Sequence, residues 1–292
     1  METFRLPNGL SADVFRPVSA GWGCAVLVLH GGGWRHGAKE GVHTRCAALT
    51  SAGLTAVAVQ YRLLGSAHWP APLDDVAVAL KWVRGAADEL GVSPDRVVVQ
   101  GHSAGGHLAL LAGTLPDEVR PAAIVAYYPT TGFYAARAPE GPRFAEAAEF
   151  DSEGRAPAWT LFDVPVPAAE LRAASPIDLV SPQSPPTLLI HGTADTVIPW
   201  RVSSAFHERL LDLGVLTDLL LVGGRDHEFD RAPFMRSTLA HATEAFVRRA
   251  VVDRQAIEAE SSRYPFPPRD GEEETDPSSH ARPKATSRVG LN

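Results

Sequence analysis

The sequence has two cysteines among its 292 residues, which are too few for a disulfide framework. Cys24 opens an apolar run and Cys46 lies in a stretch with helical periodicity, so we expect two buried free thiols. No stretch reaches the about 18 consecutive apolar residues of a transmembrane helix. Residues 1–17 carry acidic and polar side chains where a signal peptide has an apolar run. These absences favour a soluble, cytoplasmic protein without a membrane span.

The sequence also has no block of Lys or Arg. Its 27 Lys and Arg face 34 Asp and Glu, which gives a formal net charge of −7. Nothing in this balance favours nucleic acid or an anionic membrane as a partner. The 45% hydrophobic and 21% charged residues are typical of a globular protein, and the sequence leaves the oligomeric state open.

Short apolar runs alternate with helical periodicity from about residue 10 to 250. Strands are expected at 24–29, 54–59, 97–100, 122–127, 187–192 and 217–222. Helices are expected at about 40–52, from about 72, after 101–106, at about 201–213 and at about 234–250. This alternation predicts an α/β fold with a mostly parallel sheet and helices on both faces. Function in such a sheet belongs at the carboxyl ends of the strands.

Two segments interrupt the alternation. Residues 130–185 are rich in Pro, Ala and Gly, and an insertion of this length favours a lid or pocket wall over a plain surface excursion. Residues 253–292 contain almost no apolar side chains in their later part and are expected to be a disordered tail. The folded domain is therefore predicted to span residues 1–252.

Residues 101–105 read GHSAG, which fits the G-x-S-x-G nucleophile elbow. The motif follows the predicted strand RVVVQ and precedes the helical stretch HLALLAG, which is the strand–turn–helix setting that an elbow requires. Glycines on both sides of Ser103 remove Cβ atoms that would collide with the strand and helix. A simple helix cap at Ser103 would not need these glycines. We therefore predict Ser103 as the nucleophile of a serine hydrolase.

The first predicted central strand ends in His30 and three glycines, Gly31–Gly33, followed by Trp34. This HGGG-type motif is typical of an oxyanion hole, because its glycines let backbone N–H groups approach a substrate carbonyl. The N–H of Ala104, the residue after the nucleophile, is expected to be the other donor. A phosphate cradle is the alternative, but neither a G-x-G-x-x-G spacing nor a Walker lysine is present.

In a serine hydrolase built on such a sheet, the catalytic residues follow one another along the chain in the order serine, Asp or Glu, and histidine. Asp195 lies in the loop after the strand at 187–192, and His227 lies in the loop after the strand at 217–222. Both positions are carboxyl ends of predicted strands. We predict that His227 takes the Ser103 proton and that Asp195 fixes the imidazole tautomer.

Several segments together resemble α/β-hydrolase esterases of the hormone-sensitive-lipase and acetyl-esterase kind, and most closely the BD-FAE-type esterases of bacteria. The resemblance spans about residues 5–250. The segments that carry it are HGGGW (30–34), QYRL (60–63), LDDVAVALKWV (73–83), LGVSPDRVVVQGHSAGGHLALLAG (90–113), SPI (175–177), HGTADTVIP (191–199) and GRDHEF (224–229).

The resemblance implies an α/β-hydrolase fold. It also implies that the substrates are small-molecule esters with short acyl chains and that hydrolysis needs no cofactor or metal. It implies that Gly32 and Gly33 donate to the oxyanion together with Ala104. The chain before HGGGW is short, so the N-terminal cap helices of the hormone-sensitive-lipase branch are expected to be absent. The substrate pocket is expected to include Trp34, His102 and Trp200.

Other functions remain open at this point. An amidase or arylformamidase would use the same three residues, and the sequence does not separate it from an esterase. A non-catalytic binding protein on the same scaffold usually loses a member of the triad, whereas Ser103, Asp195 and His227 are all present. A long-chain lipase is less favoured because no apolar lid helix is conspicuous.

Overall fold

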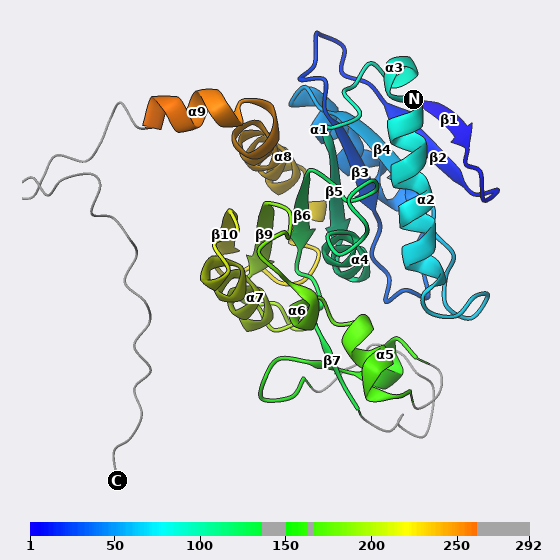
Figure 1. Cartoon of the computed structure of the whole chain (residues 1–292), viewed down its shortest axis with the longest axis vertical. Helices are drawn as coiled ribbons and strands as arrows, with labels where there is room; N and C mark the ends of the chain where they lie inside the picture. Colours follow the sequence, from blue (N-terminus) through cyan, green and yellow to red (C-terminus); the bar gives the residue numbers. More distant parts are fainter. Residues whose placement is uncertain (136–149, 163–165, 262–292) are drawn as a thin grey trace, which may run out of the picture. The chain divides into compact units, whose positions relative to one another are not determined.

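The computed structural model describes residues 1–135, 150–162 and 166–261, in two units, Met1–Arg254 and Gln255–Asn292. The first unit holds an eight-stranded sheet with the order β1-β2-β4-β3-β5-β6-β9-β10 (Figure 1). Its strands are β1 (Glu2–Arg5), β2 (Ser11–Phe15), β3 (Ala25–Leu29), β4 (Thr55–Val59), β5 (Val97–His102), β6 (Ala123–Tyr127), β9 (Thr187–Gly192) and β10 (Thr217–Val222). The pairs β1–β2 and β2–β4 are antiparallel and the others are parallel.

The central strands are apolar throughout because both faces of the sheet are covered. In β3 every residue is buried. Leu27 and Leu29 belong to one hydrophobic core and Val26 and Val28 to the other, as the two-residue period of a strand requires. The predicted strand ranges agree with β3, β4, β5, β6, β9 and β10 to within one or two residues.

Helices cover both faces of the sheet, as predicted. Helices α2, α4 and α7 contribute to the core that contains Leu27, and helices α1 and α8 contribute to the core that contains Val26. The two groups of helices therefore lie on opposite faces of the sheet (Figure 1). The helices are α1 (His43–Ser51), α2 (Ala71–Gly85), α3 (Ala87–Leu90), α4 (Ala104–Ala112), α5 (Ala168–Ala173), α6 (Pro176–Leu179), α7 (Arg201–Asp212), α8 (Pro233–Val247) and α9 (Arg254–Ser261), with short 3₁₀ turns η1 (Lys39–Val42), η2 (Ala158–Thr160) and η3 (Phe229–Arg231) and a π-helical turn η4 (Arg248–Val252).

The strands β1 and β2 extend the sheet beyond the strands expected from the sequence. Three of the four residues of β1 are exposed, so this edge strand has no continuous apolar run that would reveal it. Asp13 of β2 is buried and accepts hydrogen bonds from Thr3, Lys39 and His43. This carboxylate therefore ties the antiparallel edge to the segment that follows the glycine loop.

The insertion predicted at 130–185 is described in part. Its described residues form a two-stranded parallel ribbon, β7 (Phe133–Tyr134) and β8 (Ala156–Pro157), followed by η2 and the short helices α5 and α6. Residues 136–149 and 163–165 lie outside the described residues, and the role of the insertion as a lid stays a prediction.

The segment predicted to be a disordered tail begins with a helix in the structure. Residues 254–261 form α9, and their sequence RQAIEAES is rich in good helix formers. The rest of that segment, residues 262–292, lies outside the described residues. The predicted free thiols are confirmed, since Cys24 and Cys46 are buried and unpaired and burial raises the pKa of each to about 12.

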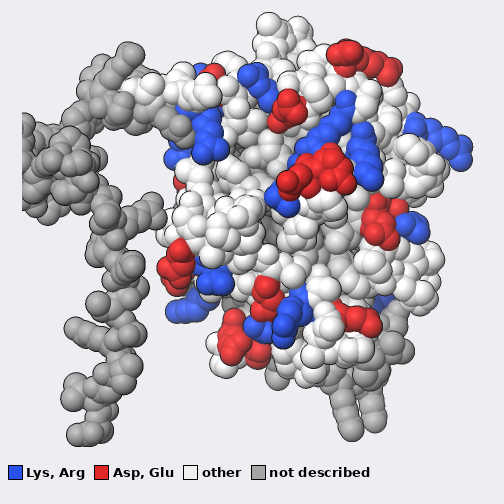
Figure 2. Space-filling view, viewed as in Figure 1, with Lys and Arg blue, Asp and Glu red and all other residues white. Residues whose placement is uncertain are grey.

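Charged side chains of both signs are mixed over the face of the molecule in Figure 2. Several are paired at the surface, for example Arg155 with Asp178 at 3.1 Å and Arg16 with Glu2. Pairs of this kind add little stability. Within the described residues, no helix has both the length and the apolar composition needed to cross a membrane.

We expect Leu27→Ala in the central strand β3 to lower the free energy of unfolding by about 2–5 kcal/mol, because Leu27 is fully buried and its loss leaves a cavity. The matched control is Leu211→Ala on α7, where the leucine is 51% exposed, and its effect is expected to stay within about 0.5 kcal/mol. Urea unfolding of both variants measures the difference. Equal losses would contradict the placement of Leu27 in the core.

Candidate active site

Ser103 lies in the sharp turn between β5 and α4. Its backbone has φ 54° and ψ −117°, a left-handed conformation that is strained for a residue with a side chain. Its N–H donates to the carbonyl of Tyr127 at 2.9 Å, and its carbonyl accepts from the N–H of His107 at 3.0 Å. These bonds hold the turn against β6 on one side and start α4 on the other. The strained strand-to-helix elbow predicted from the sequence is therefore present.

The glycines of the elbow are required by close backbone contacts. A Cβ added at Gly101 would lie 1.9 Å from the carbonyl oxygen of Gly105. A Cβ at Gly105 would lie 2.4 Å from the carbonyl oxygen of His30, at the end of β3. Real side chains do not come this close, so the start of α4 can pack against β3 and β5 only with glycine at these positions.

The glycine loop after β3 lies directly beside Ser103. A Cβ added at Gly31 would lie 3.3 Å from Cβ of Ser103. Gly32 and Gly33 have φ 116° and 57°, and a Cβ at Gly32 would meet the carbonyl oxygen of His36 at 2.3 Å. The loop turns back on itself because the N–H of His36 donates to the carbonyl of Gly32 at 2.9 Å. Glycine alone fits this close turn next to the serine.

Asp195 and His227 are joined by a hydrogen bond of 2.8 Å between Oδ2 and Nδ1. The side chain of Asp195 is fully buried, whereas that of His227 is 13% exposed. Oδ1 of Asp195 accepts the backbone N–H groups of Val197 and Ile198 at 2.9 and 2.8 Å. The carboxylate is thus fixed by its own loop and directs its other oxygen at the imidazole.

A second histidine, His191, also contacts Asp195. Its Nε2 lies 3.2 Å from Oδ2 and 3.0 Å from the carbonyl of Ile198, while its Nδ1 lies 2.8 Å from the Ser203 hydroxyl. Burial raises the pKa of Asp195, but the hydrogen bonds from His191 and His227 outweigh burial and hold that pKa well below its ordinary value. Asp195 therefore stays ionised throughout the neutral and mildly acidic range.

The two loops that carry Asp195 and His227 are bound to each other. Oδ1 of Asp226 accepts the backbone N–H and the hydroxyl of Thr196 at 2.8 and 2.9 Å and the N–H of His227 at 2.7 Å. In addition, the N–H of Ala194 donates to the carbonyl of Arg225 at 3.0 Å. The distance between the acid and the imidazole is therefore set by the loops as well as by their own bond.

Ser103 and His227 open into one cavity of about 380 Å³. The predicted oxyanion donors Gly32, Gly33 and Ala104 line the same cavity. Asp195 does not line it, because this residue lies behind the imidazole. The structure thus brings the residues predicted from four separate strand ends to one place.

The rest of the cavity wall was only partly expected. Trp34 lines the cavity as predicted, and its indole N–H donates to Nδ1 of the buried His107 at 3.1 Å. The described part of the insertion contributes residues to the wall. The lining residues that the sequence did not single out are Arg35, His36, Thr130, Phe150, Ala156, Trp159, Thr160, Val197, Ile198 and Glu228. In the described part of the chain, no three His, Cys, Asp or Glu side chains are grouped as metal ligands would be.

The placement of His102 and Trp200 in the substrate pocket is wrong for the described structure. His102 precedes Ser103, but the alternation of side chains along β5 directs its ring to the face of the sheet that α1 and α8 cover. There the ring of His102 stacks on that of Tyr127, with the two ring centroids 4.6 Å apart. Trp200 stands at the start of α7, where its ring packs under the guanidinium of Arg201 at 4.8 Å. Neither residue lines the cavity that Ser103 shares with His227.

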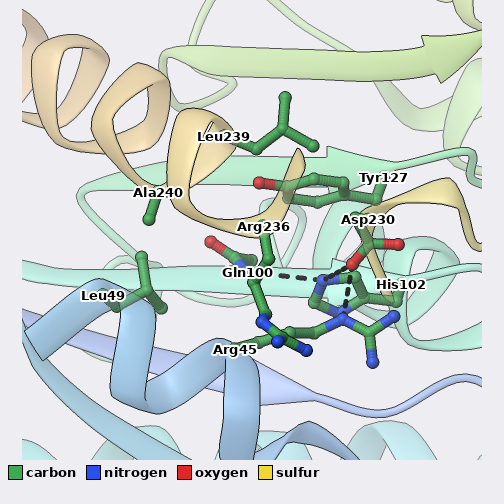
Figure 3. A pocket seen from close by; sticks show the side chains of 9 residues that line it. All are labelled: Arg45, Leu49, Gln100, His102, Tyr127, Asp230, Arg236, Leu239 and Ala240. Atoms are coloured by element: carbon green, nitrogen blue, oxygen red, sulfur yellow. Dashed lines mark hydrogen bonds and ion pairs between the residues drawn. The ribbon is translucent and has the colours of Figure 1, made fainter. Parts of the chain in front are cut away.

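His102 instead belongs to a buried polar cluster with Asp230 and Arg45. Figure 3 shows these three side chains facing one another beside a small cavity. Oδ2 of Asp230 lies 2.5 Å from Nε of Arg45 and 3.4 Å from Nε2 of His102. Burial raises the pKa of Asp230, but His102, Arg45 and the hydroxyl of Tyr128 together lower it to about 2. Burial and the nearby Arg45 lower the pKa of His102 to about 3, so this imidazole is neutral at physiological pH.

The sheet, the elbow and the shared cavity define a protein of the α/β-hydrolase fold. The model of the BD-FAE family matches residues 13–210. The chain belongs to the BD-FAE family.

Known esterases are among the similar proteins. Esterase LipC of Mycobacterium tuberculosis is 31% identical over 238 residues, which cover 76% of this chain and 57% of LipC. The ethyl acetate hydrolase of Pseudomonas putida is 31% identical over 233 residues, which cover 77% of this chain and 71% of that protein. The crystal structure of an acetyl ester-xyloside bifunctional hydrolase from Caldicellulosiruptor lactoaceticus superposes with a TM-score of 0.66 at 28% identity, covering 82% of this chain and 88% of that one.

We expect Gly101→Ala to lower the free energy of unfolding by about 1–3 kcal/mol or more, because the new methyl group meets the backbone of Gly105. The control is Gly85→Ala at the end of α2, where no atom lies within 4 Å of an added Cβ, and its effect is expected to be neutral or stabilising by up to about 1 kcal/mol. Thermal unfolding compares the two. A Gly101 variant as stable as the wild type would contradict the close packing of the elbow.

The low pKa of Asp230 predicts a pH-dependent stability. A carboxyl whose folded pKa is lowered stabilises the protein above its ordinary pKa of 3.8, and it loses this effect as the pH falls through about 2. The difference in unfolding free energy between the wild type and Asp230→Asn is therefore expected to shrink by on the order of 2 kcal/mol between about pH 5 and pH 2. Urea unfolding over this range measures it. A constant difference would show that Asp230 has an ordinary pKa in the folded protein.

Proposed function

We propose that this protein is a serine carboxylesterase that hydrolyses small acyl esters through an acyl-enzyme intermediate. In this proposal Ser103 is the nucleophile, His227 the general base and Asp195 the residue that orients the base. The N–H groups of Gly32, Gly33 and Ala104 form the oxyanion hole.

The observation that carries the proposal is the hydrogen bond of 2.8 Å between Asp195 and His227 behind a cavity that also exposes Ser103. The carboxylate of Asp195 can only accept a hydrogen bond, so Nδ1 of His227 carries the proton. Nε2 then has a free lone pair and is the nitrogen that can take a proton from Ser103. This tautomer is the one that a general base requires.

The reaction follows from these positions. Oγ of Ser103 attacks the ester carbonyl while Nε2 of His227 takes its proton, and the carbonyl oxygen becomes an oxyanion. Nε2 returns the proton to the departing alcohol oxygen as the C–O bond breaks, which leaves the acyl group on Ser103. Water then attacks the acyl carbon while Nε2 takes its proton. Nε2 returns this proton to Oγ of Ser103 as the ester bond to the serine breaks and the acid is released. Each oxyanion donor contributes about 3 kcal/mol to the transition state.

Ester rather than amide substrates are supported by the similar proteins, two of which are named as an esterase and an ethyl acetate hydrolase. A cavity of about 380 Å³ is within the size range of small-molecule sites. A cytoplasmic location and the absence of a nucleic-acid partner remain predictions from the sequence.

Ser103→Ala is expected to lower the hydrolysis of p-nitrophenyl acetate by at least about 10⁴-fold and to abolish covalent labelling by a fluorophosphonate probe. The reason is that the acyl group and the phosphonyl group bind to the same oxygen. The control is Ser51→Ala on the exposed part of α1, which is expected to behave as the wild type. A wild type that is neither labelled nor active would overturn the proposal.

The same wild-type preparation can separate the substrate classes. The p-nitrophenyl esters from acetate to palmitate test the chain length, and N-formylkynurenine tests the formamide alternative. We expect the highest kcat/KM on the short esters. Higher kcat/KM on N-formylkynurenine would assign the triad to an arylformamidase.

A further inference from the structure

Tyr128 follows β6, and its ring contacts that of His227. Its ring centroid lies 4.5 Å from that of the imidazole, with the two planes at 58°. The tyrosine is fully buried and does not line the cavity. Since it touches the proposed base but not the substrate space, any role in the reaction is indirect, and His227 is the nearest site residue through which it can act.

The backbone of Tyr128 is strained. Its φ of 38° is in the left-handed region, which few residues with a side chain adopt. The N–H of Tyr128 donates to the carbonyl of Ile190 at 2.8 Å, so the neighbouring strand β9 holds this conformation. Strain of this kind costs about 1–3 kcal/mol and persists where the surroundings over-determine it, often at functional sites.

The hydroxyl of Tyr128 donates to Oδ1 of Asp230, in the buried cluster described above. The other oxygen of Asp230 binds Nε of Arg45, which reaches it from α1. The side chains of Arg45 and Asp230 are 7% and 3% exposed. A buried hydroxyl with a buried ion pair as its partner is costly to form and resists displacement.

Asp230 is also tied to the base through the chain. It lies three residues after His227, and the segment between them makes a tight turn with φ 56° at Glu228 and the short helix η3. His227 is therefore held at both ends. Asp195 binds Nδ1, the ring of Tyr128 packs against the imidazole, and the bonds of Asp230 to Tyr128 and Arg45 anchor the segment that follows His227.

Filling the space alone would not require this arrangement. A phenylalanine or leucine would pack there without a buried hydroxyl, and an ordinary strand end would avoid the left-handed backbone. We propose that Tyr128 is a positioning residue for His227: its hydroxyl, anchored on Asp230 and Arg45, holds the ring that keeps Nε2 directed at Ser103. This role rests on the proposed function.

Tyr128→Phe tests the role because it removes one oxygen and keeps the ring. We expect kcat for p-nitrophenyl acetate to fall about 10-fold with KM nearly unchanged, because substrate binding does not use Tyr128 while proton transfer needs an aligned base. The rate of phosphonylation of Ser103 by the fluorophosphonate probe is expected to fall by the same factor. A purely structural loss would lower the fraction of active protein, which titration with the probe measures, and not the rate per active site.

The matched control is Tyr127→Phe, one residue earlier on β6. Tyr127 is also buried, but its hydroxyl bonds to Thr243 at 3.3 Å and not to Asp230. This variant loses a buried hydroxyl hydrogen bond as well, and its kcat and phosphonylation rate per active site are expected to match the wild type.

Three results would contradict the positioning role. It is overturned if Tyr128→Phe keeps kcat and the phosphonylation rate within about twofold of the wild type. It is also overturned if Tyr127→Phe loses as much as Tyr128→Phe. A wild type without hydrolysis or labelling would instead overturn the proposed function, and the positioning role with it.

Discussion

The contact between two backbones, the elbow of Ser103 and the end of β3, is the constraint on which the site depends. Gly105 lies so close to the carbonyl of His30 that no Cβ fits between them. This contact brings the start of α4 against the glycine loop, so residues of both segments line one cavity. The strained φ of Ser103 is tolerated because packing on both sides of the elbow holds it in place.

The residues of the site are held in two different ways: some by the central strands of the sheet, and others by hydrogen bonds to carboxylates in the loops. Ser103 and the glycine loop are positioned by β3 and β5 in the centre of the sheet, where every strand residue is buried. Asp195 and His227 lie on loops, and loops are held more weakly than central strands. The hydrogen bonds that Asp195 and Asp226 accept from backbone N–H groups compensate for this, since charged acceptors form the stronger bonds.

The sequence predicted the central part of this structure well because its signals are local. A continuous apolar run marks each buried strand, and the elbow and HGGG motifs each lie within a few residues. The strand alternation that directs His102 away from the cavity is a local signal too, and it separates His102 from the cavity although His102 is the immediate neighbour of Ser103. The short, exposed strand β1 has no apolar run to reveal it.

The contacts of the buried cluster could not be predicted in the same way. Arg45 and Asp230 are 185 residues apart in the chain, and no periodicity relates them. The left-handed backbone of Tyr128 arises from the packing of β6 beside β9, which a single sequence does not display. Asp226 and Asp230 stand on either side of His227 in the sequence, but this spacing does not reveal which groups they bind.

The order of the strands along the chain has a consequence for synthesis. Chains emerge from the ribosome N-terminus first, and parallel sheets are completed by contacts that are distant in sequence. Ser103 and its glycine loop belong to β3 and β5, whereas Asp195 and His227 follow β9 and β10, the last strands of the sheet. The nascent chain thus carries Ser103 before the residues that we propose as its acid and base. Under the proposed function, reactivity toward esters arises only when the final strands have joined the sheet, so recovery of activity during refolding would report completion of the fold rather than its beginning.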